Sequence, residues 1–188
     1  MTDLIVLFQR AVDGFSANVQ RVGADQWHLP TPDDEWDVRM LVNHVTVEQL
    51  WVPPLLSGST VAEIGNRLDG DQLGDDPKAT WNDAVKASAA AFGAPGALER
   101  MAMLSSGERP VAEYCWEMTT DALIHNWDLA RGIGADDTMD PELVDVIYER
   151  TLPYVDELAK TGMFKPPVPI GPNADPQTKI LSIFGRKN

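Results

Sequence analysis

Cysteine is almost absent from this sequence, and long apolar runs are missing altogether. The only cysteine among the 188 residues is Cys115, so no disulfide can form within the chain. No apolar stretch approaches the ~20 residues that a membrane-spanning helix needs, and the first residues lack the basic segment and apolar run of a signal peptide. These absences predict a protein of the reducing cytoplasm with no membrane partner.

Basic residues are also scarce. The chain has 15 lysines and arginines against 29 aspartates and glutamates, which gives a formal net charge of −14 and a pI of about 4.4. The acidic residues are spread along the chain, as expected for a solvated surface. Because such a surface repels phosphate backbones, we expect no nucleic-acid partner.

The sequence has no nucleophile or nucleotide-binding motif of a familiar kind. It contains neither Gly-x-Ser-x-Gly nor a glycine-rich phosphate loop. Cys115 falls in the middle of an expected helix, where thiols are usually inert packing groups. Arg39 and Arg131 could bind a carboxylate, although surface ion pairs are the ordinary explanation for such residues. Four of the six tryptophans, Trp36, Trp51, Trp116 and Trp127, are expected to be core residues or pocket walls.

What the sequence does contain is helical periodicity, with apolar residues three and four apart. Long helices are predicted at 2–22, 36–52, 77–92, 111–131 and 140–158. Pro53-Pro54 is expected to end the second helix and Pro153 to kink the fifth. Shorter elements are predicted at 61–68 (helix), 101–104 (a short strand or an irregular crossing, followed by a turn at 105–110) and 179–184 (helix). We expect an all-α bundle over residues 1–161 and an extended, proline-rich C-terminal tail over 162–188 that packs on it.

Asp121 and His125 lie one turn apart in the helix predicted at 111–131, so their side chains share a face. The buried seam expected along that helix has the spacing of a helix bundle. It consists of Val111, Cys115, Met118, Ala122, His125 and Leu129. His125 therefore takes a position where an apolar residue would be usual, and a buried imidazole beside a carboxylate is costly unless it is paired or bound to a metal.

The chain has three histidines, and His44 is the candidate for a third ligand because it lies at the edge of the apolar face of the helix at 36–52. Two imidazoles and a carboxylate suit zinc, with nickel or iron(II) as alternatives, and leave positions open for water or substrate. Glu48, one turn after His44, could be a fourth ligand or could orient an imidazole, as could Asp128. The alternative is a buried Asp–His pair without metal. His28 has no neighbour at ligand spacing.

Two separated motifs and the tail resemble a known family. The segment Glu35-Trp-Asp-Val-Arg-Met-Leu-Val-Asn-His44 is similar to the opening motif of the mycothiol-dependent maleylpyruvate isomerase N-terminal domain family, of the DinB-like superfamily. Asp121-x-x-x-His125-Asn-Trp-Asp-Leu-Ala-Arg is similar to its second motif. The tail from Phe164-Lys-Pro-Pro-Val-Pro to Gly185-Arg resembles that of short actinobacterial members.

The resemblance implies an up-down-down-up four-helix bundle with additional short helices and a divalent metal held by His44, Asp121 and His125. It implies a transferase or isomerase that uses mycothiol, or a related thiol, on a small electrophile. A metal-bound thiol or water is expected at the reacting centre, and no side chain is assigned as catalytic. A monomer or homodimer is expected. The alternative is a non-catalytic metal-binding or stress-response protein of the same fold.

Two departures from the family pattern bear on these expectations. The isomerase has glutamate where this chain has Asp121, which is one methylene shorter. The isomerase also has a further C-terminal domain, whereas only a short segment follows the helix predicted at 140–158. Activity on maleylpyruvate itself is therefore not expected.

Overall fold

A computed structural model describes residues 3–161 and 165–188. The chain forms two compact units, Met1–Ala135 and Asp136–Asn188, which are described separately here. The division into a bundle of 1–161 and a packed tail of 162–188 stays a prediction. Within the described residues, none of the helices combines the length and the apolarity that a bilayer crossing requires.

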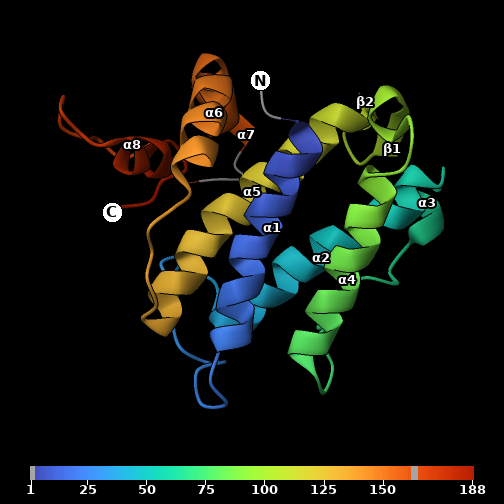
Figure 1. Cartoon of the computed structure of the whole chain (residues 1–188), viewed down its shortest axis with the longest axis horizontal. Helices are drawn as coiled ribbons and strands as arrows, with labels where there is room; N and C mark the ends of the chain where they lie inside the picture. The colour runs from blue at the N-terminus through green and yellow to red at the C-terminus, as the bar shows by residue number, and fades with distance from the viewer. Residues whose placement is uncertain (1–2, 162–164) are drawn as a thin grey trace. The chain divides into compact units, whose positions relative to one another are not determined.

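The first unit is built from four long helices, as the periodicity predicts. They are α1 (Leu4–Arg21), α2 (Val38–Leu56), α4 (Pro77–Phe92) and α5 (Val111–Ile133). Aspartates fix where three of them begin, because their side chains accept hydrogen bonds from otherwise unpaired N–H groups of the first turn. These caps are Asp3, Asp37 and Asp76. In Figure 1, α1 lies along α5, and α2 lies beside α4.

Three hydrogen bonds establish the direction of each helix. Lys78 at the start of α4 donates to the carbonyl of Gln20 at the end of α1, over 2.9 Å, so these two helices are antiparallel. Gln26, just after α1, donates to the carbonyl of Ile133 at the end of α5. Arg100, which follows α4, donates to the carbonyl at the end of α2. The helices α1 and α5 are therefore parallel, as are α2 and α4, which is the expected up-down-down-up order.

The seam predicted along α5 is buried at every position, His125 included, with 3% of that residue exposed. α5 begins directly after Pro110 and ends at Ile133, and it is capped by Gly134, whose φ of 69° suits a residue without a Cβ. The helix therefore runs two residues past the predicted end, and Gly132 is helical.

This unit departs from the prediction in three places. α2 continues through Pro53 and Pro54, whose carbonyls both accept the N–H of Ser57, so the helix closes normally after losing two of its own donors. Residues 107–110, expected to be part of a turn, form β2 (Gly107–Pro110). It pairs in antiparallel register with β1 (Met101–Leu104), which is the predicted strand. α3 (Val61–Ile64) is shorter than predicted, and η1 (Ala97–Glu99) is a single 3₁₀ turn.

The second unit contains α6 (Pro141–Thr151), η2 (Leu152–Tyr154), α7 (Val155–Thr161) and α8 (Pro176–Ile183). The predicted kink at Pro153 is the 3₁₀ segment η2. α8 begins three residues before the expected start, because Asp175 caps it by accepting the N–H of Thr178. Residue 2, where the first helix is predicted to begin, and Phe164 of the family's tail motif lie outside the described residues.

Cys115 tests the packing of the seam. Burial raises the pKa of its thiol to about 12, so the reactive thiolate is scarce at neutral pH. We expect a disulfide reagent such as DTNB to label Cys115 in the native protein only as fast as the protein unfolds. In about 6 M guanidinium chloride, which unfolds the chain, labelling should be rapid. Stoichiometric labelling of the native protein within seconds would contradict this packing.

Candidate metal centre

The structure brings together His44 from α2 and Asp121 and His125 from α5. Each offers one ligand atom, and these atoms all lie within 4.8 Å of one another. Asp121 Oδ1 is 3.5 Å from His44 Nε2 and 3.3 Å from His125 Nε2. The aspartate side chain, although shorter than glutamate, therefore reaches both imidazoles. The predicted residues thus meet between two facing helices.

His125 is held from behind by Asp128. The Asp128 carboxylate is fully buried, and its Oδ2 lies 3.0 Å from His125 Nδ1. A carboxylate on one ring nitrogen fixes the tautomer and orientation of an imidazole and leaves the other nitrogen available for a ligand. Here the other nitrogen is Nε2, which faces Asp121. The contact considered for Asp128 from sequence spacing is therefore present.

The charges of the side chains by themselves favour an ion pair between Asp121 and His125. Burial lowers the pKa of His125, but the Asp121 and Asp128 carboxylates raise it more, to about 9. For Asp121, burial acts to raise the pKa, but the charge and hydrogen bonding of His125, followed by His44, outweigh it and hold the pKa well below its usual range. A metal ion would need His125 neutral, so metal uptake near pH 7 would release a proton.

The second oxygen of Asp121 provides a test of whether a cation fits. Asp121 Oδ2 is buried and has no hydrogen-bond partner among the described residues. An unpaired buried carboxylate oxygen is costly, and a divalent cation would satisfy it. One carboxylate and two imidazoles form a donor set that suits zinc, nickel or iron(II). The residues present therefore fit a metal ion.

Glu48 lies one turn after His44 and beside the same site. Burial, followed by the negative charge of Asp121, raises the pKa of its carboxyl to about 7. Glu48 is not one of the three residues whose ligand atoms converge. Its assignment as an additional ligand or an outer partner stays a prediction.

The raised pKa of Glu48 predicts a pH-dependent stability. In the unfolded chain the carboxyl ionises near 4.5, whereas in the metal-free folded protein it ionises near 7, so stability falls as the pH rises through that window. Glu48→Gln should therefore stabilise EDTA-treated protein by about 1–2 kcal/mol at pH 8 and by much less at pH 4.5. Urea unfolding at both pH values measures the difference, and an equal effect at both would contradict the raised pKa.

Trp36 forms one wall of the site, and its position beside both imidazoles could not be predicted from the spacing of residues in the sequence. Its ring lies 4.5 Å from the His44 ring and 5.5 Å from the His125 ring, between centroids. The preceding segment is anchored at Thr31, whose hydroxyl donates to the Trp36 carbonyl over 2.8 Å. Gly132 of α5 lies against this segment, since a Cβ there would come within 3.3 Å of the Thr31 side chain.

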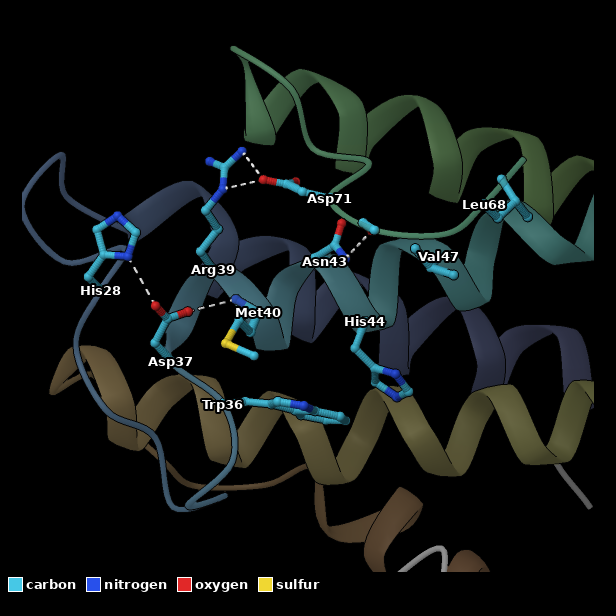
Figure 2. Close-up of a pocket in the computed structure, with 11 residues that line it drawn as sticks. His28, Trp36, Asp37, Arg39, Met40, Asn43, His44, Val47, Leu68 and Asp71 are labelled. Atoms are coloured by element: carbon cyan, nitrogen blue, oxygen red, sulfur yellow. Dashed lines mark hydrogen bonds and ion pairs between the residues drawn. The ribbon is translucent and has the colours of Figure 1, made fainter. Parts of the chain in front are cut away.

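A pocket of about 570 Å³ opens beside His44, and Figure 2 shows its lining. Trp36 forms one side, and Met40, Asn43 and Val47 project from α2. Arg39, considered as a carboxylate binder from the sequence, is paired with Asp71 over 2.7 Å. His28 lies at the edge of this pocket, where its Nδ1 is 3.0 Å from Asp37.

The fold and the site define a DinB-like helical bundle with a histidine and aspartate centre between α2 and α5. The fold is similar to the crystal structure of a mycothiol-dependent maleylpyruvate isomerase in which one histidine is replaced by alanine. The TM-score is 0.63 at 17% sequence identity, over 82% of this chain and 70% of that one.

The family follows from the sequence comparison. Residues 8–130 match the Mycothiol maleylpyruvate isomerase N-terminal domain family, and the chain belongs to that family. The uncharacterized proteins Rv0738 and MT0763 of Mycobacterium tuberculosis (strains H37Rv and CDC 1551) are each 34% identical to it over 145 residues. That alignment covers 75% of this chain and 73% of each relative. The recognition made from the two motifs is confirmed.

Proposed function

We propose that this protein binds one divalent metal, zinc first, through His44, Asp121 and His125. We propose further that the metal-loaded protein acts on a small electrophile with mycothiol or a related thiol as cosubstrate. The reaction is either transfer of the thiol to the electrophile or isomerisation of the electrophile. The observation that carries the proposal is the unpaired, buried Asp121 Oδ2 beside two imidazoles. The family and the solved isomerase, both named for mycothiol, support the choice of thiol.

The chemistry divides between the ion and the chain. A bound divalent ion lowers the pKa of a thiol and so supplies thiolate at neutral pH. Asp128 fixes the His125 ring by its contact at Nδ1. The Trp36 ring lies beside both imidazole rings, 4.5 Å from that of His44 and 5.5 Å from that of His125 between centroids, and so forms one wall of the site. The adjoining pocket offers room for the electrophile next to His44.

Elemental analysis of protein purified without a histidine tag tests the metal. We expect about one divalent ion per chain, lost in His44→Ala and in His125→Ala and retained in His28→Ala, whose histidine lies outside the group of three. Removal of the ion with EDTA should lower the melting temperature, and zinc should restore it. Protein that holds no metal and gains no thermal stability from zinc or nickel would refute the proposal.

Thiol chemistry needs its own measurement. Metal-loaded protein, mycothiol and a panel of electrophiles should yield the thiol adduct or the isomer, at a rate that falls to background after EDTA treatment. If the metal is retained but the whole panel is untouched, the protein is a non-catalytic metal-binding member of the family.

A further inference from the structure

The residues that line the pocket beside His44 indicate the kind of ligand that this pocket binds. We infer that it takes the uncharged, flat, conjugated part of the electrophile, and that it discriminates against a carboxylate at that place. This inference rests on the proposed function for the identity of the ligand as an electrophile. The pocket's volume, the apolar side chains in its lining and the pairing of its charged groups support it.

The pocket is of the right size and has an apolar side. A volume of about 570 Å³ falls within the range of pockets that hold small organic molecules. Met40 is 50% exposed, although it is a large apolar side chain, and Val47 and Leu68 also line the pocket. The Trp36 indole lies beside the His44 imidazole, and the planes of these two rings are inclined by 31° to each other. Figure 2 shows Trp36 and Met40 on one side, next to His44, where a flat conjugated group could stack.

The polar groups of the lining are already engaged with one another. Arg39 donates through Nε to Asp71 Oδ2 over 2.7 Å and through a terminal nitrogen to the Gly74 carbonyl over 2.9 Å. Asn43 donates to the Gly70 carbonyl and accepts the N–H of Gln72. Both groups are therefore occupied by partners within the chain.

The remaining charge is unfavourable for an anion. Asp37 accepts a hydrogen bond from the N–H of Met40 and lies 3.0 Å from His28, and Asp71 faces Arg39. A carboxylate in the pocket would have to compete with Asp71 for the guanidinium and would approach two aspartates in a chain of net charge −14. Its desolvation would then lack compensation. An uncharged ligand avoids these costs.

A matched pair of probes tests the discrimination. Cinnamamide and cinnamate are both flat and conjugated and differ in charge. We would titrate each into ¹⁵N-labelled, EDTA-treated full-length protein, so that a carboxylate cannot gain affinity by ligating an ion. Cinnamamide should shift the Trp36 indole N–H signal saturably, with a dissociation constant at least about tenfold lower than that of cinnamate. Equal or tighter binding of cinnamate, or no shift by either probe, would overturn the inference.

A variant that adds a cation should reverse the order. Met40→Lys adds a positive charge to the pocket at a position already half exposed, and we expect it to tighten cinnamate binding and weaken that of cinnamamide. Met103→Lys makes the same change at an exposed methionine on β1, outside the pocket, and should leave both affinities unchanged. If cinnamate gains nothing from Met40→Lys, charge does not govern this pocket and the inference fails.

The two proposals can fail separately. Repeating the cinnamamide titration with zinc-loaded protein should preserve the Trp36 shift. A protein that takes up no zinc but still prefers cinnamamide would refute the proposed function and leave the pocket as a site for an uncharged ligand. A protein that holds zinc but binds neither probe would refute the inference about the pocket alone.

Discussion

Asp121→Asn is expected to weaken zinc binding by roughly a thousandfold. Asp121 is the only charged one of the three proposed ligands, and the binding free energy of such a site is large. Asparagine preserves the shape of the side chain, so the loss would report the charge and the second carboxylate oxygen, which has no other partner. Competition of the protein with a chromogenic zinc chelator at fixed pH measures the affinity.

Two further aspartates set the scale for that result. Asp128 contacts His125 from behind, so Asp128→Asn should cost only about ten- to a hundredfold. Asp83 lies exposed on α4, and Asp83→Asn should leave the affinity unchanged. If Asp121→Asn retains the zinc affinity of the natural chain, Asp121 is not a ligand. If the centre is instead a structural Asp–His pair, His125→Leu should be tolerated, with no zinc bound before or after the change.

Trp81→Ala is expected to destabilise the first unit by about 3–5 kcal/mol, because it empties a large volume where α4 meets α1. Trp81 is fully buried, its ring centroid lies 4.7 Å from that of Phe15, and its indole N–H donates to the Ser16 hydroxyl over 2.9 Å. Urea unfolding of EDTA-treated protein gives the free energy of unfolding without a contribution from metal binding.

Controls separate the cavity from the hydrogen bond. Trp81→Phe keeps most of the ring and loses the donor, so we expect a cost clearly smaller than that of the alanine variant, of which about 1 kcal/mol is the hydrogen bond. Val6 is 48% exposed on α1, and Val6→Ala should change stability by less than about 0.5 kcal/mol. A loss below 1.5 kcal/mol for Trp81→Ala (about half the smallest expected cost) would mean that α1 and α4 are not packed as described.

The sequence predicts the bundle well because helical periodicity and caps are local signals. The seam of α5, the start of α4 at Pro77 and the break near Pro153 all follow from residues within a turn of one another. The continuation of α2 through Pro53 does not, since it depends on how the last carbonyls find a donor in Ser57. β2 does not follow from local signals either, because this short segment has no apolar alternation and becomes a strand only by pairing with β1.

The same distinction between local and long-range signals applies to the residues of the candidate site. The one-turn spacing of Asp121 and His125 is visible in the sequence. That His44 faces them depends on contacts between helices that are distant in the chain, and the family resemblance, not spacing, predicted it. The Trp36 ring beside His44 and the pairing of Arg39 with Asp71 depend on the course of two loops. Spacing carries no signal for either contact.

The close approach at Gly132 means that α5 positions both the proposed metal centre and one wall of the adjoining pocket. This helix carries Asp121 and His125, and its last turn backs the segment that anchors Trp36 through Thr31. A small roll of α5 would therefore move two of the three proposed metal ligands and a pocket wall together. Thermodynamic linkage then requires reciprocity: if the metal changes the affinity of the pocket by some factor, an occupant of the pocket changes the affinity for the metal by the same factor.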